Sequence, residues 1–151
     1  MFFPEINIYF IPDYRGQHEI FNTIGSRSIH KHDQYHFAVE DGKIIWFHQD
    51  HLEKEVFNIQ TLAVVKPRQW INLIVTYDSQ ESKAKVFLGG DLVKEKEGSG
   101  FLSQDWGHFA GIGRHFYSET YLSGAIDEFT MYNYALPLDE IQYISKGLCM
   151  T

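Results

Sequence analysis

The chain has 151 residues, of which 44% are hydrophobic and 16% aromatic, so it can build one globular domain over residues 1–151 and is too short for a second. Its formal charge of −7 comes from scattered acids, and the longest charged run, KEKEG at 94–98, carries both signs. The sequence therefore excludes nucleic acid and insertion into a membrane, because it shows no basic patch and no apolar stretch of about 20 residues.

A single cysteine, Cys149, excludes an intrachain disulfide, so the core alone must hold the fold. The sequence contains no Asn-x-Ser/Thr sequon, and its start, MFFPEINIYF, lacks the basic, apolar and small-residue pattern of a signal peptide. These absences argue against a disulfide-bonded animal ectodomain and are compatible with a bacterial secreted domain.

Short strands separated by turn signals account for nearly the whole chain. The first, EINIYFI at 5–11, alternates apolar and polar residues and ends at Pro12-Asp13. Asp41-Gly42 is a strong hairpin signal between two later strands. Further strands are expected at 18–24, 34–40, 43–48, 55–61, 70–77, 83–89, 107–113 and 125–133.

One segment, PLDEIQYISKG at 137–147, has the pattern of a helix. Pro137 suits the first helical position, Asp139 and Glu140 suit the first turn, and Gly147 suits the position after the last turn. Many short strands followed by one short helix predict an antiparallel sandwich or barrel, in the length class of a jelly roll or an immunoglobulin-like domain. The immunoglobulin alternative lacks its Cys…Trp…Cys spacing.

Several segments, spread over most of the chain, resemble those of one known family. They are, in chain order, INIYFIPD (6–13), FAVEDGKIIWF (37–47), W-x-x-x-x-V-T-Y-D (70–78), Gly-Gly-Asp (89–91), G-I-G-R (111–114) and LSGAIDEFTMYNYALPLDEI (122–141). Their order and spacing resemble the laminin G-like jelly-roll domain of the concanavalin A-like lectin/glucanase superfamily.

This resemblance implies an all-β, antiparallel two-sheet jelly-roll sandwich with one short C-terminal helix, placed outside the cell or at the cell surface. Family members usually begin with one or two further strands before the strand matched by 6–13. We therefore expect a domain that lacks the family's first strands, with an exposed sheet edge at 2–11 where a partner chain or a neighbouring domain can pair.

Asp127 and Glu128 are adjacent in an expected strand, so one of them should face the core. Phe129 and Met131 are taken as core-facing, which places Asp127 inward and Glu128 outward. Ile126 is also apolar, which indicates a bulge near 126–128. A buried carboxylate requires a hydrogen bond, a counter-charge or a metal. Asp127 is therefore either a structural acceptor, a calcium ligand, as the family resemblance suggests, or part of a catalytic site.

Catalysis is the weakest of these three uses. The glucanase branch of the superfamily places two glutamates on one strand, in the motif Glu-x-Asp-x-x-Glu. If Asp127 aligns with the middle acid, Ala125 stands in place of the first glutamate and Phe129 and Thr130 stand where the second should be. The resemblance therefore implies a protein that is not an enzyme.

Two histidine groups are candidates for a transition-metal site, with solvated loop histidines as the default interpretation. The first contains His30, His32, Asp33 and His36, and the second contains His48, Asp50 and His51.

Aromatic residues near the last two strands are the best indication of a ligand site. In lectin-like jelly rolls, ligands often meet the rim or the concave face, where a flat ring stacks on a sugar and polar groups bind its hydroxyls. The predicted ligand-binding residues are Trp106, His115, Phe116, Tyr117 and Tyr121. The competing interpretation makes Trp106, Phe109 and Tyr121 core residues, and Trp46 and Trp70 are expected in the core because each lies in an apolar strand.

The sequence thus predicts a non-catalytic module that binds a carbohydrate or a protein surface, with calcium as its one candidate cofactor. The alternative is a structural or assembly domain of a larger secreted, surface or phage protein with no small ligand of its own.

Overall fold

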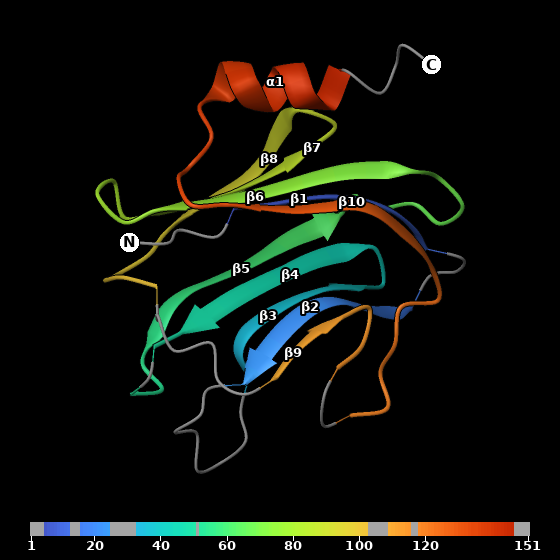
Figure 1. Cartoon of the computed structure of the whole chain (residues 1–151), viewed down its shortest axis with the longest axis horizontal. Helices are drawn as coiled ribbons and strands as arrows, with labels where there is room; N and C mark the ends of the chain where they lie inside the picture. Colours follow the sequence, from blue (N-terminus) through green and yellow to red (C-terminus); the bar gives the residue numbers. More distant parts are fainter. Residues whose placement is uncertain are drawn as a thin grey trace.

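Two antiparallel five-stranded sheets face each other in the computed structural model, which describes residues 5–12, 16–24, 33–50, 52–102, 109–115 and 118–146 (Figure 1). The first sheet contains, in spatial order, β10 (Gly124–Tyr132), β1 (Glu5–Pro12), β6 (Ile71–Asp78), β7 (Lys83–Leu88) and β8 (Asp91–Glu97). The second sheet contains β5 (Glu55–Ala63), β4 (Lys43–Gln49), β3 (Asp33–Glu40), β2 (Gln17–Ile24) and β9 (Phe109–Ile112). The predicted jelly-roll sandwich is confirmed.

The main core lies between the two sheets and is rich in aromatic rings. Trp46 is fully buried, with its ring centroid 4.3 Å from that of Phe57, and its Nε1–H donates to the hydroxyl of Tyr35 at 2.6 Å. This confirms the core position of Trp46. The core position of Trp70 is wrong, because this residue precedes β6, outside the alternation of the strand, and is 56% exposed.

The helix α1 (Leu138–Lys146) covers the face of the first sheet that points away from the second sheet (Figure 1). Ile141 packs there with Leu136 against Ile74 and Phe87. The Ile141 N–H donates to the carbonyl of Pro137 at 3.0 Å, which places Pro137 at Ncap, one position before the expected N1. In the described ranges, no helix combines the length and the apolar character that crossing a membrane requires.

The predicted strands are confirmed with small changes at their ends, and one strand was missed. Both residues of the predicted hairpin turn, Asp41 and Gly42, have positive φ (49° and 81°), as a tight hairpin between β3 and β4 requires. The missed strand is β8, whose sequence DLVKEKE lacks an apolar face. It lies at the end of its sheet, where charged residues are common, and Lys83 on β7 contacts Glu95 on β8 at 2.8 Å.

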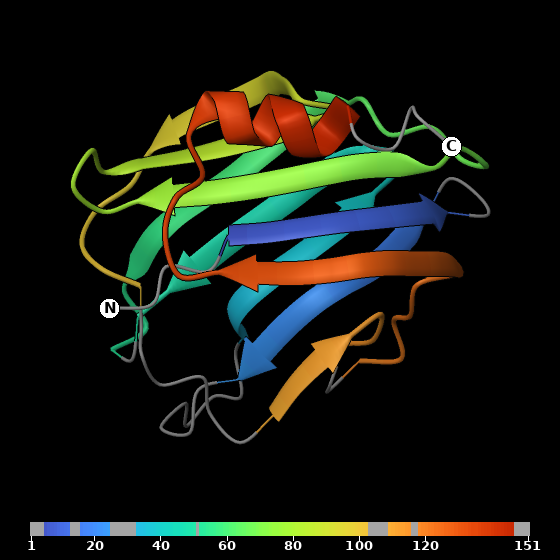
Figure 2. The ribbon, with the colours of Figure 1, turned by 45° about the horizontal axis from the view of Figure 1, so that its top comes forward.

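The N-terminal strand does not form the expected exposed edge. Strand β1 pairs with β10 on one side and with β6 on the other, as Figure 2 shows. Its backbone hydrogen bonds are therefore shared with both neighbours, so the prediction of an exposed edge is wrong for residues 5–12. A partner chain or a neighbouring domain at the N-terminal segment stays a prediction. In the described sheets, the end strands are β10, β8, β5 and β9.

Candidate ligand-binding pocket

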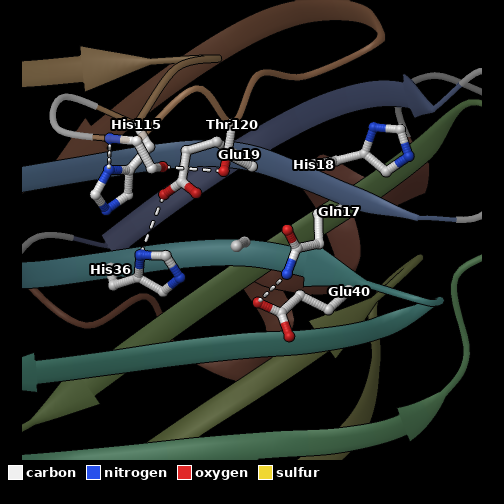
Figure 3. Close-up of a pocket in the computed structure, with 9 residues that line it drawn as sticks. Gln17, His18, Glu19, His36, Glu40, His115 and Thr120 are labelled. Carbon is white, nitrogen blue, oxygen red and sulfur yellow. Dashed lines mark hydrogen bonds and ion pairs between the residues drawn. The ribbon is translucent and has the colours of Figure 1, made fainter.

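A polar pocket of about 180 Å³ opens on the second sheet, on the face turned away from the core (Figure 3). In β3, Tyr35, Phe37 and Val39 point into the core, so His36 and Glu40 lie on the opposite face. We call this the His36 pocket. It is lined by Gln17, His18, Glu19, His36, Ala38, Glu40, His115, Ser118 and Thr120.

Glu19 reaches this pocket because of a bulge in β2. The pairing with β3 shifts between Glu19 and Phe21, and as a result both Ile20 and Phe21 pack into the core. Glu19 is left on the opposite face, where it is 2% exposed. Its Oε1 lies 3.2 Å from Nδ1 of His36, as Figure 3 shows. The pocket therefore contains a buried carboxylate with an imidazole beside it.

The segment after β9 folds over the sheet and brings His115 to the pocket. The His115 N–H donates to the carbonyl of Thr120 at 2.9 Å, and Nδ1 of the same residue accepts from the Ser118 N–H at 3.0 Å. The side chain of Asn22 donates to the carbonyl of Arg114 at 2.5 Å, which fastens this segment to β2. The rings of His115 and His36 consequently lie 5.9 Å apart between centroids.

The hydrogen bond between Asn22 and Arg114 depends on the close approach of the backbone at Gly111. A Cβ atom at position 111 would lie 2.5 Å from the carbonyl oxygen of Arg114 and 3.3 Å from Nδ2 of Asn22. Any side chain there would displace the segment that carries His115, so the glycine is required by the space available.

An apolar surface adjoins the pocket on β4. Phe47 and Ile45 are the cross-strand partners of His36 and Ala38, and cross-strand partners share one face of a sheet. The rings of Phe47 and His36 lie 6.1 Å apart, and both Ile45 and Phe47 are half-buried. The face thus offers an apolar surface beside a polar pocket. On the pocket's other side, Nε2 of Gln17 lies 3.5 Å from Oε1 of Glu40.

The structure brings one of the predicted ligand-binding residues to the pocket. His115 lines it, whereas Tyr121 is 51% exposed and pairs with Arg114 in an isolated bridge, with the guanidinium carbon of Arg114 5.9 Å from its ring centroid. The exposure of Tyr121, and of Phe109 at 45%, shows that neither is a core residue. The other three predicted residues, Trp106, Phe116 and Tyr117, lie outside the described residues.

The sequence does not predict most of the pocket. It indicates His36 only as a candidate for metal binding, although the alternation of QYHFAVE separates His36 and Glu40 from the core residues of the same strand. Glu19 gave no such signal, because the bulge in β2 breaks the alternation.

The inward position predicted for Asp127 is wrong. The pairing of β10 with β1 shifts between Asn7 and Tyr9, and Glu128 has φ of 50°, so the bulge predicted at 126–128 is present. Ile126 and Phe129 pack against the core, and both Asp127 and Glu128 are exposed. The Asp127 Oδ1 accepts from the Glu128 N–H at 2.9 Å. The bulge therefore lets the sheet keep both carboxylates in solvent.

Met131, which was expected in the core, is 40% exposed. It lies near the end of β10, an outermost strand of the first sheet, where little packs over a side chain.

The part of the chain that the structure describes holds no group of three or more His, Cys, Asp or Glu suited to a metal, and the two predicted transition-metal groups lie only partly within it. His48 is 3% exposed and lies in the core, 5.7 Å from the ring of Tyr35 and 6.0 Å from that of Phe57. Asp50 accepts backbone N–H groups of its own loop. His30, His32 and His51 and the side chain of Asp33 lie outside the described residues.

The residues predicted to stand in place of the glucanase glutamates lie on β10. Ala125 is exposed, Thr130 is half-buried, and Phe129 packs 5.5 Å from the ring of Phe21 in the core.

Comparison with known proteins supports the same fold. A family model, Laminin_G_3, described as "Concanavalin A-like lectin/glucanases superfamily", matches residues 9–142. No curated protein matches the chain. The IT-sialidase CBM40 of Ruminococcus gnavus, bound to alpha2,3 sialyllactose, has a TM-score of 0.79 at 15% identity, over 96% of this chain and 83% of that one.

The Botulinum Neurotoxin Type G Receptor Binding Domain has a TM-score of 0.73 at 16% identity, over 97% of this chain and 38% of that one. At these identities the two comparisons show that the folds are similar. Because the family model matches most of the length of this chain, the chain belongs to the concanavalin A-like lectin/glucanase superfamily.

Proposed function

We propose that this protein is a non-catalytic carbohydrate-binding module whose ligand occupies the His36 pocket. The observation that carries the proposal is the position of the pocket, which combines polar groups from β2, β3 and the segment after β9 on a face that α1 leaves open. The carbohydrate-binding module with sialyllactose among the similar structures supports this class of ligand.

The chemistry of the pocket suits a sugar. Sugar hydroxyls both donate and accept hydrogen bonds, and the pocket presents carboxylates, an amide, hydroxyls and imidazoles. A sugar ring also has an apolar face, which can pack on Phe47 and Ile45. The volume of about 180 Å³ suits one sugar residue better than an oligosaccharide.

Hydrolysis is not part of the proposal, although two carboxylates line the pocket. Glycosidases direct two carboxyl groups toward one bond. Here Glu19 is held by His36 at 3.2 Å and Glu40 contacts Gln17 at 3.5 Å, and Figure 3 shows the two carboxylates pointing in different directions.

Three further predictions belong to this function. Trp106, Phe116 and Tyr117 join His115 and Tyr121 as ligand-binding residues, supported by the adjacency of Phe116 and Tyr117 to His115 in the sequence. Calcium, with Asp127 as a ligand, stays a prediction. A glycan ligand also suits an extracellular or cell-surface location.

The test is a glycan array probed with the purified chain, in millimolar calcium and in chelator. We expect saturable binding to a related set of glycans and a loss of that binding in His36→Gln and His115→Ala. Tyr143→Ala is the matched control, because Tyr143 is 80% exposed on α1, and both sheets lie between α1 and the pocket. A blank array in both buffers, with all variants folded, would contradict the proposal.

The alternative, an assembly domain, has one observation in its favour. In the described part of the chain, β9 is an end strand of the second sheet. Its residues Phe109 and Ile112 are 45% and 54% exposed. An apolar end strand is a surface on which another chain can pair. Concentration-dependent association in sedimentation, abolished by Ile112→Lys, together with a blank glycan array, would favour this alternative.

A further inference from the structure

Resting on the proposed function, we propose that the His36 pocket selects an uncharged sugar residue and rejects a sugar that carries a carboxylate, such as sialic acid. The preference follows from the charges that line the pocket. It also distinguishes this chain from the R. gnavus module of similar fold, whose structure contains sialyllactose.

Two acids and no lysine or arginine are found among the nine described residues that line the pocket. Glu19 is buried, and Glu40 is half-buried on the adjacent strand. A carboxylate on the ligand would meet these two like charges at short range. Proteins usually recognise carboxylates with the paired N–H groups of arginine, and the described lining does not supply them.

Two cations lie beside the pocket without lining it. Lys43 is the cross-strand partner of Glu40 and is exposed, and the guanidinium of Arg114 lies over the ring of Tyr121. Nδ1 of His36 lies against Glu19 at 3.2 Å, so this nitrogen serves the buried carboxylate. Neither Lys43 nor Arg114 lines the pocket, so neither supplies the N–H groups that a carboxylate on the ligand would need.

An uncharged sugar, by contrast, finds complementary groups. Its hydroxyls donate to the carboxylate of Glu40, and they accept from donors in the lining. His115 is one such donor, because its Nδ1 accepts from the Ser118 N–H, which leaves the proton of the neutral ring on Nε2. A hydrogen bond to a charged acceptor is stronger than one between neutral groups, so Glu40 contributes to affinity for a neutral sugar.

The experiment compares glycans in matched pairs that differ only in a terminal sialic acid, first on the array and then by calorimetry. We expect the uncharged member of each pair to bind about tenfold or more tightly than its sialylated partner. Rising salt should leave the affinity for the uncharged glycan unchanged and strengthen the weak binding of the sialylated one, because salt screens repulsion between like charges.

Glu40→Gln provides the sharpest readout, since it should move the two affinities in opposite directions. The neutral glycan should bind several-fold more weakly because it loses a charged acceptor, and the sialylated glycan should bind more tightly because one like charge is gone. Glu97→Gln is the matched control, because Glu97 is an exposed acid on β8 of the other sheet. It should change neither affinity.

The outcomes separate this inference from the function on which it rests. Equal or tighter binding of the sialylated glycans, lost in His36→Gln, would overturn the selectivity and leave the binding function standing. Glycan binding that is unchanged in folded His36→Gln and His115→Ala would place the ligand elsewhere and overturn the inference. A complete lack of glycan binding would overturn both.

Discussion

Nδ1 of His36 and Oε1 of Glu19 lie 3.2 Å apart, and the glutamate side chain is only 2% exposed. Their strands are neighbours in the second sheet, yet the two residues are not cross-strand partners: Glu19 pairs with Ala38, and His36 lies two residues away from Ala38 on the same face. This contact holds a carboxylate where water cannot fully solvate it, and it joins the stability of the sheet to the chemistry of the pocket.

We expect His36→Ala to lower the free energy of unfolding by about 1–3 kcal/mol, because it removes the group beside a buried carboxylate. Combining it with Glu19→Gln should cost less than the sum of the two single changes, with a coupling energy of about 0.5–3 kcal/mol. Urea unfolding of the four proteins at neutral pH measures this coupling. Strictly additive effects would show that the contact contributes nothing to stability.

Replacing Gly111 should affect stability and binding together. In Gly111→Ala the new Cβ atom would lie 2.5 Å from the carbonyl oxygen of Arg114, a backbone atom, so the segment that carries His115 must move. We expect a loss of stability of about 1–3 kcal/mol from this overlap. We also expect weaker binding of any glycan that the array identifies. A variant that keeps full affinity would show that His115 does not contribute to the site.

Asp127→Asn should be close to neutral, within about 0.5 kcal/mol, because the side chain is exposed. Its Oδ1 accepts from the Glu128 N–H, and an asparagine oxygen can accept the same bond. Thermal melting of the wild type and the variant, each with calcium and with chelator, is the measurement. A rise in the melting temperature with calcium that Asp127→Asn abolishes would instead establish the predicted calcium site.

Stability should fall at alkaline pH because of two core tyrosines. Burial raises the pKa of Tyr35, an effect only partly offset by the hydrogen bond from Trp46, and burial together with the charge of Asp78 raises the pKa of Tyr77. Below about pH 10 both the folded and the unfolded chain keep these hydroxyls protonated. At higher pH the unfolded chain loses the protons first, which favours unfolding.

For Tyr35 we expect a loss of about 1.4 kcal/mol per pH unit above pH 10. Urea midpoints measured across this range give the slope. Tyr35→Phe should flatten the slope, even though it also lowers stability at neutral pH by removing the acceptor of the Trp46 Nε1–H. Tyr143→Phe is the control, since Tyr143 is 80% exposed and should leave the slope unchanged.

The sequence by itself determined the class of fold, most of the strands, the helix and the family. Strand alternation, turn residues such as Asp41-Gly42 and the order of the family segments are local signals, and they can be read without knowing which strands pair. The bulge near Asp127 was also indicated by its neighbours Ile126 and Phe129. Strand β8 was missed because an outer strand needs no apolar face, and the charged residues of DLVKEKE are equally typical of a solvent-exposed loop.

Only the tertiary structure decided where the His36 pocket lies and which acid is buried. The β2 bulge, which no local signal indicates, buries Glu19, and the β10 bulge exposes Asp127. The pairing of β1 with two neighbours removed the predicted edge. The His36 pocket joins residues that are up to 103 positions apart, from Gln17 to Thr120. Such contacts depend on register and sheet order, which long-range packing sets and a single sequence does not display.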